Sequence, residues 1–233
     1  MLDKSGHLKG MPLLILMRHG QSLWNAANLF TGWVDVPLTD KGIEEAIQGG
    51  KGIAHLPIDE VHTSTLIRAQ MTAMLALSQH EEGKNPVIYH NNDGSERGDW
   101  NQPRGEVESI LPVHVAWQLN ERMYGDLQGL NHQVIRDKYG DEQVHIWRRS
   151  FDISPPGGES LQMTAARTIP YLDKAIIPSL NEGKNIFVSA HGNSLRSIIM
   201  SIEDLSREEI LKLEVPTGIP LIYEYDNGTF VRK

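Results

Sequence analysis

The sequence contains no cysteine among its 233 residues. Disulfide bonds, thiolate nucleophiles, redox-active cysteine pairs and cysteine-ligated zinc sites are therefore excluded, and a reducing compartment is the default expectation. With 39% hydrophobic and 22% charged residues, the composition is that of an ordinary globular protein. At about 100 to 200 residues per domain, the length predicts one domain, or at most two small ones.

Long apolar runs are also missing, since none approaches the roughly 18 residues of a membrane-spanning helix. The only N-terminal apolar run, residues 11–17, is interrupted by Pro12. The formal net charge of −8 disfavours broad electrostatic binding to nucleic acid or to an acidic membrane, so an anionic ligand requires a local cationic pocket. We therefore expect a cytoplasmic protein that binds neither nucleic acid nor membrane, and we interpret residues 1–12 as a flexible leader.

Strand and helix patterns alternate along the remaining chain. Short apolar runs predict strands at residues 13–17, 60–63, 113–117 and 186–190. A helix is predicted after the Thr39 cap, and a second follows the strand at 60–63, with Ile67, Met71, Met74 and Leu75 facing the core. Further helices are predicted at residues 132–138, 142–149 and 160–177, the last with a kink at Pro170. The Ser206/Glu209 capping box predicts a late helix, and Asn227-Gly228 predicts the turn of a terminal hairpin. This alternation predicts an α/β three-layer sandwich whose mixed, mostly parallel sheet is flanked by helices.

Residues 13–233 are predicted to form a single domain. Within it, residues 80–112 are largely polar and contain the turn-forming run Asn91-Asn92-Asp93-Gly94. Such a run breaks regular secondary structure. We interpret residues 80–112 as a polar surface insertion.

Two distant stretches share one pattern, a strand followed by His-Gly-polar-Ser. The first reads LILMRHGQSL from residue 14 and the second IFVSAHGNSL from residue 186. Because ligands bind outside the carboxyl ends of the strands in an open α/β sheet, His19 and His191 would share one crevice if the two strands are neighbours. An unrelated loop position is the more frequent explanation for either histidine alone, but the shared register favours a functional pair.

Arginines accompany these histidines, at Arg18, Arg68, Arg148, Arg149 and Arg196. The planar guanidinium matches phosphate and carboxylate oxygens. For all of them except Arg18, a solvated helix face is a competing explanation. Gathered at strand ends in an acidic protein, they would form a focused anion site.

The motifs of several other chemistries do not occur, namely GxxxxGK[ST], GxGxxG, HExxH and GxSxG. Neutral imidazole is a competent nucleophile toward phosphorus, and cationic donors stabilise the transferred group without a metal. The residues therefore fit a phosphohistidine enzyme. Glu121, after the strand at 113–117, is the best-placed carboxylate for proton transfer; a surface glutamate paired with Arg122 is the alternative.

Several motifs occur together and in a fixed order: Arg18-His19-Gly20, Phe30-Thr31-Gly32-Trp33, Thr63-Ser64 with Arg68-Ala69, Leu119-Asn120-Glu121-Arg122, Tyr124-Gly125-Asp126-Leu127-Gln128-Gly129-Leu130-Asn131, Trp147-Arg148-Arg149, and His191-Gly192-Asn193-Ser194-Leu195-Arg196. With them the sequence resembles, over residues 13–225, the 2,3-bisphosphoglycerate-dependent phosphoglycerate mutases of the histidine phosphatase superfamily. The RHG triplet alone is weak evidence, whereas the ordered set is specific.

The resemblance implies a phosphoglycerate mutase-like fold and a role for each matching residue. His19 would be phosphorylated, Arg18, Arg68 and His191 would line the phosphate pocket, and Glu121 would donate and accept the proton. Substrate binding is implied for Ser22, Asn25, Thr31, Gly32, Arg122, Tyr124, His132, Arg148, Arg149, Gly192 and Asn193. The resemblance also implies 2,3-bisphosphoglycerate as the priming phosphoryl donor, no metal, small phosphoglycerates as binding partners, and a homodimer as a common assembly.

Two positions depart from the family pattern. Gln21 stands where glutamate is usual, and His132 stands where the family has a substrate-binding lysine. Because histidine is only partly charged near neutrality, we expect binding of the substrate carboxylate to become pH-dependent.

The reaction implied by the resemblance is interconversion of 3-phosphoglycerate and 2-phosphoglycerate in glycolysis and gluconeogenesis. Minor bisphosphoglycerate synthase and phosphatase activities would accompany it. One alternative is a histidine-type phosphatase that acts on small phosphorylated metabolites. An alternative of another class is a non-catalytic protein that binds a phosphorylated ligand.

Overall fold

One mixed β-sheet forms the centre of the molecule in the computed structural model, which describes residues 10–89 and 109–233. Its strands in the described residues are β1 (Leu13–Arg18), β2 (Glu60–Thr63), β3 (Asn85–Tyr89), β4 (Ile110–Val115), β5 (Ile186–Ala190), β6 (Pro220–Asp226) and β7 (Thr229–Arg232). They lie in the order β3-β4-β2-β5-β1-β6-β7. The first five are parallel, and the terminal hairpin β6-β7 adds antiparallel to β1.

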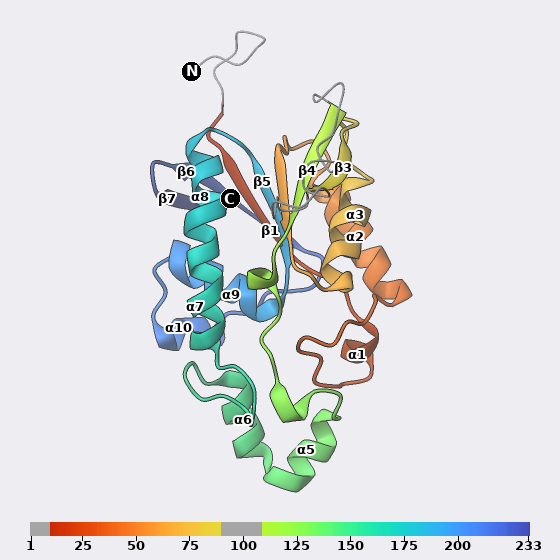
Figure 1. Cartoon of the computed structure of the whole chain (residues 1–233), viewed down its shortest axis with the longest axis vertical. Coiled ribbons are helices and arrows are strands. Elements are labelled where there is room, and N and C mark those ends of the chain that lie inside the picture. Colours follow the sequence, from red (N-terminus) through yellow and green to blue (C-terminus); the bar gives the residue numbers. More distant parts are fainter. Residues whose placement is uncertain (1–9, 90–108) are drawn as a thin grey trace, which may run out of the picture.

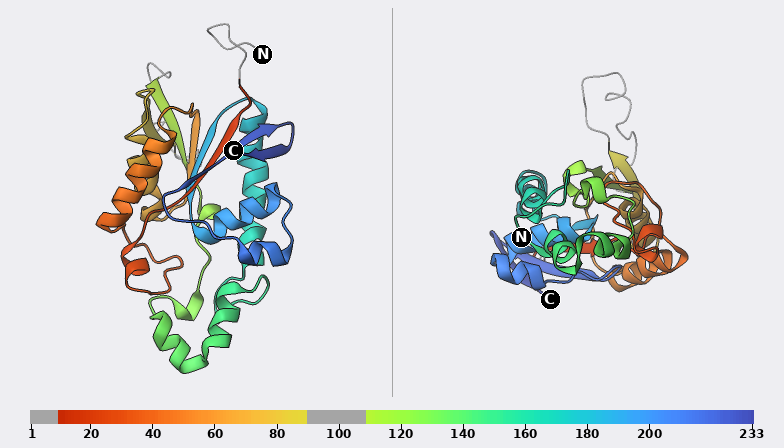
Figure 2. Two further views of the ribbon diagram at one scale, coloured as in Figure 1. Left: turned by 180° about the vertical axis from the view of Figure 1, so that it is seen from behind. Right: turned by 90° about the horizontal axis from the view of Figure 1, so that it is seen from below.

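Helices cover both faces of this sheet, which confirms the predicted three-layer α/β class (Figures 1 and 2). The helices are α1 (Leu23–Ala26), α2 (Asp40–Ile53), α3 (Ile67–Leu77), α5 (His132–Tyr139), α6 (Asp141–Arg149), α7 (Leu161–Tyr171), α8 (Ile177–Asn181), α9 (Gly192–Ile202) and α10 (Arg207–Lys212). Helices α2 and α3 lie on one face, and α7 to α10 lie on the other. Helices α5 and α6 project beyond the carboxyl ends of the parallel strands.

The core consists of two apolar layers that share β1. Leu14 and Leu16 belong to the cluster under α8 and α9, whereas Ile15 and Met17 belong to the cluster under α2 and α3. All four side chains are fully buried. Successive side chains of a strand point to opposite faces, so a strand covered on both faces needs the continuous apolar run that the sequence shows.

Most predicted elements are present close to their predicted positions. Thr39 caps α2, since its side chain accepts a hydrogen bond from the Gly42 N–H. The Ser206/Glu209 capping box begins α10. The long helix predicted across Pro170 is interrupted after that proline by a π-helical turn, η4 (Leu172–Ile176), between α7 and α8. Proline cannot donate the hydrogen bond that a regular α-helix needs at its position.

The predicted insertion at residues 80–112 is wrong at both of its ends. Strand β3 lies within it and pairs in parallel with β4, which begins at Ile110 instead of at residue 113. Proline inside a run argues against a strand, so Pro86 and Pro112 obscured both elements. The Asn91-to-Gly94 run on which the insertion rested lies outside the described residues, as do residues 1–9 of the predicted leader.

Helix α3 is rotated relative to the prediction. Its buried residues are Arg68, Ala69, Thr72, Ala73, Ala76 and Leu77, while Met71, Met74 and Leu75 are only half-buried. The small residues allow close approach to α2, and the rotation turns Arg68 inward. The methionines therefore lie at the side of the buried face of α3 and not in the middle of that face.

No helix among residues 10–89 and 109–233 has the length and hydropathy needed to cross a membrane.

Because α2 lies against α3, alanine is expected to have opposite effects on stability at two nearby glycines of α2. A Cβ at Gly50 would lie 2.5 Å from the Ala76 carbonyl oxygen, whereas a Cβ at the exposed Gly52 would find nothing nearer than 3.9 Å. We expect Gly50→Ala to lower the free energy of unfolding by about 1 to 3 kcal/mol through overpacking. Gly52→Ala should raise it by up to about 1 kcal/mol through helix propensity. Urea unfolding followed by circular dichroism measures both, and equal effects would contradict this account of the interface.

Candidate active site

His19 and His191 lie side by side at the carboxyl ends of two neighbouring strands. Strands β1 and β5 are paired in parallel, with Arg18 opposite Ala190, and the His19 N–H donates to the Ala190 carbonyl oxygen at 2.9 Å. The centroids of the two imidazole rings are 4.9 Å apart. This geometry confirms the convergence predicted from the repeated His-Gly pattern.

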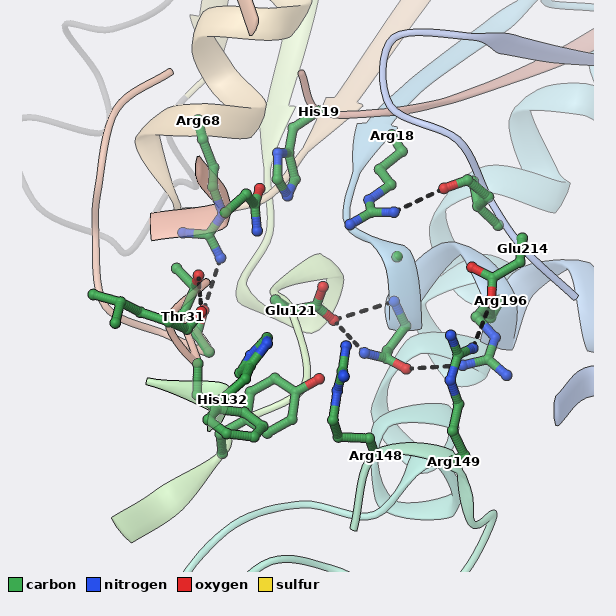
Figure 3. A pocket seen from close by; sticks show the side chains of 18 residues that line it. Arg18, His19, Thr31, Arg68, Glu121, His132, Arg148, Arg149, Arg196 and Glu214 are labelled. Carbon is green, nitrogen blue, oxygen red and sulfur yellow. Dashed lines mark hydrogen bonds and ion pairs between the residues drawn. The ribbon is translucent and has the colours of Figure 1, made fainter. Parts of the chain in front are cut away.

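The His19 ring is held in one tautomer. Its Nδ1–H donates to the Gly20 carbonyl oxygen at 2.6 Å, because a carbonyl can only accept, and Nε2 therefore carries the lone pair of the neutral ring. Burial, then the charges of Arg68 and Arg18, hold the pKa of His19 well below its ordinary value of 6.5. Figure 3 shows the ring directed into a cavity. His19 is thus a buried, neutral imidazole with a nucleophilic nitrogen.

Two arginines border His19. The fully buried Arg68 donates from Nη1 to the Val34 carbonyl oxygen at 2.9 Å and from Nη2 to the Gly32 carbonyl oxygen at 2.7 Å. Burial lowers the pKa of Arg68 to about 10, so it stays cationic at neutral pH. Arg18 donates from Nη1 to the Val215 carbonyl oxygen at 2.9 Å, and its buried Nε has no partner among the described residues. These groups favour an anion beside the His19 ring.

Glu121 lies across the cavity from His19 (Figure 3). Its Oε1 accepts hydrogen bonds from the Arg122 N–H at 2.8 Å and from the N–H and Nδ2 of Asn193 at 3.1 and 2.9 Å. Burial raises the pKa of Glu121, but these hydrogen bonds and the charges of Arg18 and Arg68 outweigh it and leave the pKa below its ordinary value. Glu121 is therefore an ionised carboxylate whose Oε2 takes no part in these bonds.

Helix α9 begins at the cavity, and its first two residues, Gly192 and Asn193, lie in the cavity wall. A Cβ at Gly192 would lie 3.5 Å from the Arg18 guanidinium and 3.7 Å from Glu121 Oε2. The N-terminus of a helix favours negative charge through its unpaired N–H groups and its dipole. Glycine at this position thus keeps the space between the arginine, the carboxylate and the helix open.

The cavity encloses about 200 Å³ and brings together most of the predicted site residues. Those in its wall are Arg18, His19, Asn25, Thr31, Gly32, Arg68, Glu121, Tyr124, His132, Arg148, Arg149, Gly192 and Asn193. They come from β1, the loops after β1 and β4, and helices α1, α3, α5, α6 and α9. Helices α5 and α6, although they lie outside the main sandwich, thus complete one wall of the cavity (Figure 3).

Three predicted residues, Ser22, Arg122 and His191, are not in this wall. Ser22 caps α1 and accepts from the Asn25 N–H. Arg122 is buried behind the wall and donates to the Tyr124 hydroxyl at 3.2 Å and to the Arg148 carbonyl oxygen at 3.1 Å. All three are therefore placed to act through neighbours that do line the cavity.

His191 is fully buried and adjoins the cavity through the His19 ring. Its Nε2 lies 2.7 Å from Ser64 Oγ, which also accepts from the Leu66 N–H. Its Nδ1 has no partner among the described residues. Burial, followed by the charge of Arg68 and the neighbouring His19, lowers the pKa of His191 well below 6.5, so it is neutral in the unliganded protein.

His132 differs from the sequence expectation in its charge. Its ring packs against Phe30 with centroids 4.2 Å apart. Burial, then the charges of Arg148 and Arg136, lower its pKa to about 4. His132 is therefore neutral throughout the physiological range, and the partial charge expected near neutrality is wrong for this environment.

Four residues of the cavity wall were not among the candidates from the sequence: Leu29, Phe30, Glu214 and Val215. A fifth, Arg196, was named with the other arginines of a possible anion site but was given no role of its own. Phe30 and Arg196 stand inside recognised motifs, which was the available signal. Arg196 is buried and donates to Asn193 Oδ1 and to the Ile210 carbonyl oxygen. Glu214 and Val215 follow α10, and no sequence pattern places that segment beside His19.

Comparisons with known proteins agree with this geometry. The sequence model of the histidine phosphatase superfamily (branch 1) matches residues 14–100 and 101–233. The chain belongs to the histidine phosphatase superfamily. It is 59% identical to the 2,3-bisphosphoglycerate-dependent phosphoglycerate mutase of Protochlamydia amoebophila, over 96% of this chain and 99% of that protein. It is 54% identical to 2,3-bisphosphoglycerate-dependent phosphoglycerate mutase 1 of Arabidopsis thaliana, over 99% of this chain and 70% of that protein.

Two solved structures share the fold of this chain. Bacillus stearothermophilus YhfR superimposes with a TM-score of 0.73 at 23% identity and covers 95% of both chains. The alpha-ribazole phosphatase from Shigella flexneri gives a TM-score of 0.70 at 24% identity, over 95% of this chain and 94% of that one. At this identity the likeness shows the fold alone.

The burial of His19 and the charges beside it lead to a prediction for its pKa. Because its pKa is lowered, we expect the ring to remain neutral at pH 6.5, where an unperturbed histidine is half protonated. Arg18→Gln removes one of the charges responsible and should raise the pKa. Acidification through the folded-state pKa protonates the nucleophile. Nitrogen NMR titration of the imidazole measures both, and a wild-type midpoint at or above 6.5 would show that the electrostatic account is wrong.

Proposed function

We propose that this member of the histidine phosphatase superfamily interconverts 3-phosphoglycerate and 2-phosphoglycerate through a phosphohistidine, with 2,3-bisphosphoglycerate as the priming phosphoryl donor. The observation that carries this proposal is a neutral imidazole in a guanidinium-lined cavity opposite an ionised carboxylate. The relatives at 59% and 54% identity, named 2,3-bisphosphoglycerate-dependent phosphoglycerate mutases, support the substrate. The reaction belongs to glycolysis and gluconeogenesis.

His19 performs the group transfer. Its Nε2 lone pair attacks phosphorus as the bond from phosphorus to the sugar-acid oxygen breaks, and the phosphoryl group moves to the ring. In the reverse half-reaction the phosphorylated ring gives this group to a hydroxyl of the monophosphoglycerate. The hydrogen bond from Nδ1 to the Gly20 carbonyl oxygen fixes which nitrogen reacts.

Glu121 holds the proton between the two half-reactions. Its ionised carboxylate takes the proton of the attacking hydroxyl, and after the bisphosphorylated intermediate has reoriented, it returns the proton to the leaving oxygen. Each turnover therefore leaves both His19 and Glu121 in their starting states. The lowered pKa of Glu121 ensures that it begins the cycle as a base.

The charges around His19 compensate the transferring phosphoryl group. Arg18 and Arg68 flank the ring, and the N-terminus of α9 at Gly192 and Asn193 faces the same space. The His191 ring contacts the His19 ring in an edge arrangement, and the charges of Arg68 and Arg18 lower its pKa as they lower that of His19. Because these groups are fixed by buried hydrogen bonds, they require little reorganisation during transfer.

The remaining residues hold the rest of the phosphoglycerate. Arg148 and Arg149 provide cationic donors, and Asn25, Thr31, Gly32 and Tyr124 provide the adjoining wall. Buried Arg122 positions Tyr124 and Arg148, and Ser22 positions Asn25. His132 contributes a neutral hydrogen-bonding group where the sequence predicted a partly charged one.

Cationic side chains supply the charge compensation that a metal would otherwise provide, so we propose metal-independent activity. Among the described residues, no group of three His, Cys, Asp or Glu side chains has a metal-binding arrangement. We further propose a cytoplasmic enzyme whose partners are small phosphoglycerates, without nucleic acid or membrane binding, and whose assembly is a homodimer.

A coupled assay of 3-phosphoglycerate conversion, run beside a phosphate-release assay, tests the proposal. We expect interconversion to depend on catalytic amounts of 2,3-bisphosphoglycerate, to be unchanged in EDTA, and to exceed phosphate release. Steady phosphate release without interconversion would favour the phosphatase. Ligand binding without an acid-labile phosphoenzyme would favour the non-catalytic alternative.

Two substitutions separate the proposed chemical roles. His19→Ala should abolish both phosphoenzyme labelling and turnover, because it removes the only nucleophile in the mechanism. Glu121→Gln should lower turnover by about 10² to 10⁴ because proton transfer is lost. Single-turnover labelling beside the coupled assay measures both effects. Wild-type turnover in either variant would refute the corresponding role.

A further inference from the structure

One acidic side chain, Glu214, lies among the arginines at the end of the cavity away from His19 (Figure 3). Its Oε1 is 2.7 Å from Nη1 of Arg149. Arg148 and Arg196 lie in the same part of the wall. Apart from Glu121, Glu214 is the only acidic residue among the described residues of the cavity wall. The mechanism above gives it no task.

The backbone of Glu214 is anchored on both sides. Arg18 donates to the carbonyl oxygen of the next residue, the buried Val215, at 2.9 Å. On the other side, the preceding helix α10 is tied to the cavity wall through the hydrogen bond from Arg196 to the Ile210 carbonyl oxygen. Arg18, which borders the reacting phosphoryl group, therefore also holds the segment that carries Glu214. This keeps the Glu214 carboxylate at the cavity.

The ion pair with Arg149 contributes little to the fold. The side chains of Arg149 and Glu214 are 36% and 68% exposed. Exposed pairs of this kind contribute at most about 1 kcal/mol to stability. Its main effect is on the charge available to a ligand, because a guanidinium that is ion-paired with Glu214 is partly neutralised toward an incoming anion.

We propose that Glu214 is a specificity-determining residue that competes with the distal anionic group of the ligand for Arg149. The inference rests on the proposed function, in which Arg149 holds the part of the phosphoglycerate away from His19. To bind, the distal anion must displace the Glu214 carboxylate or share Arg149 with it. Repulsion from Glu214 grows with the charge of the distal group, so it weakens binding of a second phosphate more than binding of a carboxylate or hydroxyl.

This selectivity matters for an intermediate that has to turn around. A bisphosphorylated ligand that is bound with equal strength at both ends would neither reorient nor dissociate readily. Glu214 weakens the binding of the ligand at the distal end only. The contacts of Arg18, Arg68 and α9 with the ligand at the reacting end are unchanged. We therefore expect it to favour monophosphoglycerates over 2,3-bisphosphoglycerate in equilibrium binding.

Calorimetric titration of full-length variants in a His19→Ala background tests this without turnover. Glu214→Gln should lower the Kd of 2,3-bisphosphoglycerate by about three- to tenfold and that of 3-phosphoglycerate by less. The difference should shrink at high salt because the interaction is electrostatic. Glu208→Gln is the matched control, because Glu208 is an exposed glutamate of α10 outside the cavity wall, and it should change neither Kd.

The outcomes separate this proposal from the proposed function. If both ligands bind the His19→Ala protein and Glu214→Gln leaves the ratio of their Kd values unchanged, or weakens both, the role of Glu214 is wrong while the proposed function stands. If neither ligand binds the His19→Ala protein, both proposals are overturned. Thermal unfolding of Glu214→Gln should match that of the parent, which excludes a folding defect as the cause.

Discussion

The parallel pairing of β1 with β5 is the constraint on which the site depends. It sets Arg18 opposite Ala190 and continues for one residue beyond the strand through the His19 N–H. A slip of one residue would exchange the two faces of β1, so that Leu14 and Leu16 would enter the layer that now holds Ile15 and Met17, and both core layers would be mispacked. The apolar packing that fixes this register therefore also fixes the separation of the two imidazole rings.

The site concentrates positive charge in a chain whose net charge is −8. Arg68 and Arg122 are among the largest fully buried side chains, and buried nitrogens of Arg18, Arg122 and Arg196 lack partners among the described residues. Burying unsatisfied donors costs free energy, which the rest of the fold must offset. An anion in the cavity that binds Arg18 and Arg196, which line it, recovers part of that cost, so the arrangement favours the liganded protein more than it favours the empty one.

The sequence was sufficient to predict those parts of the fold and the site that depend on a local pattern of residues. Buried parallel strands leave continuous apolar runs, and the repeated His-Gly turns mark the ends of two of them, so the meeting of His19 and His191 was predictable. It was insufficient where tertiary packing decides. Strand β3 depends on its partner β4, the rotation of α3 depends on close contact with α2, and the neutrality of His132 depends on burial beside Arg148. Glu214 reaches the cavity only because α10 and Arg18 hold its segment there.

The two ends of the cavity are built differently. At the His19 end, Arg68 is fully buried and fixed by two carbonyl groups, and α9 adds its N-terminus. At the other end, Arg149 is half exposed and paired with Glu214, and His132 is neutral. Strong binding at the reacting end and weaker binding at the distal end orient whichever phosphoryl group is beside His19. On the proposed mechanism, each of the two phosphates occupies the firm end in turn, so the asymmetry of the protein allows one nucleophile to act at two positions of the same ligand.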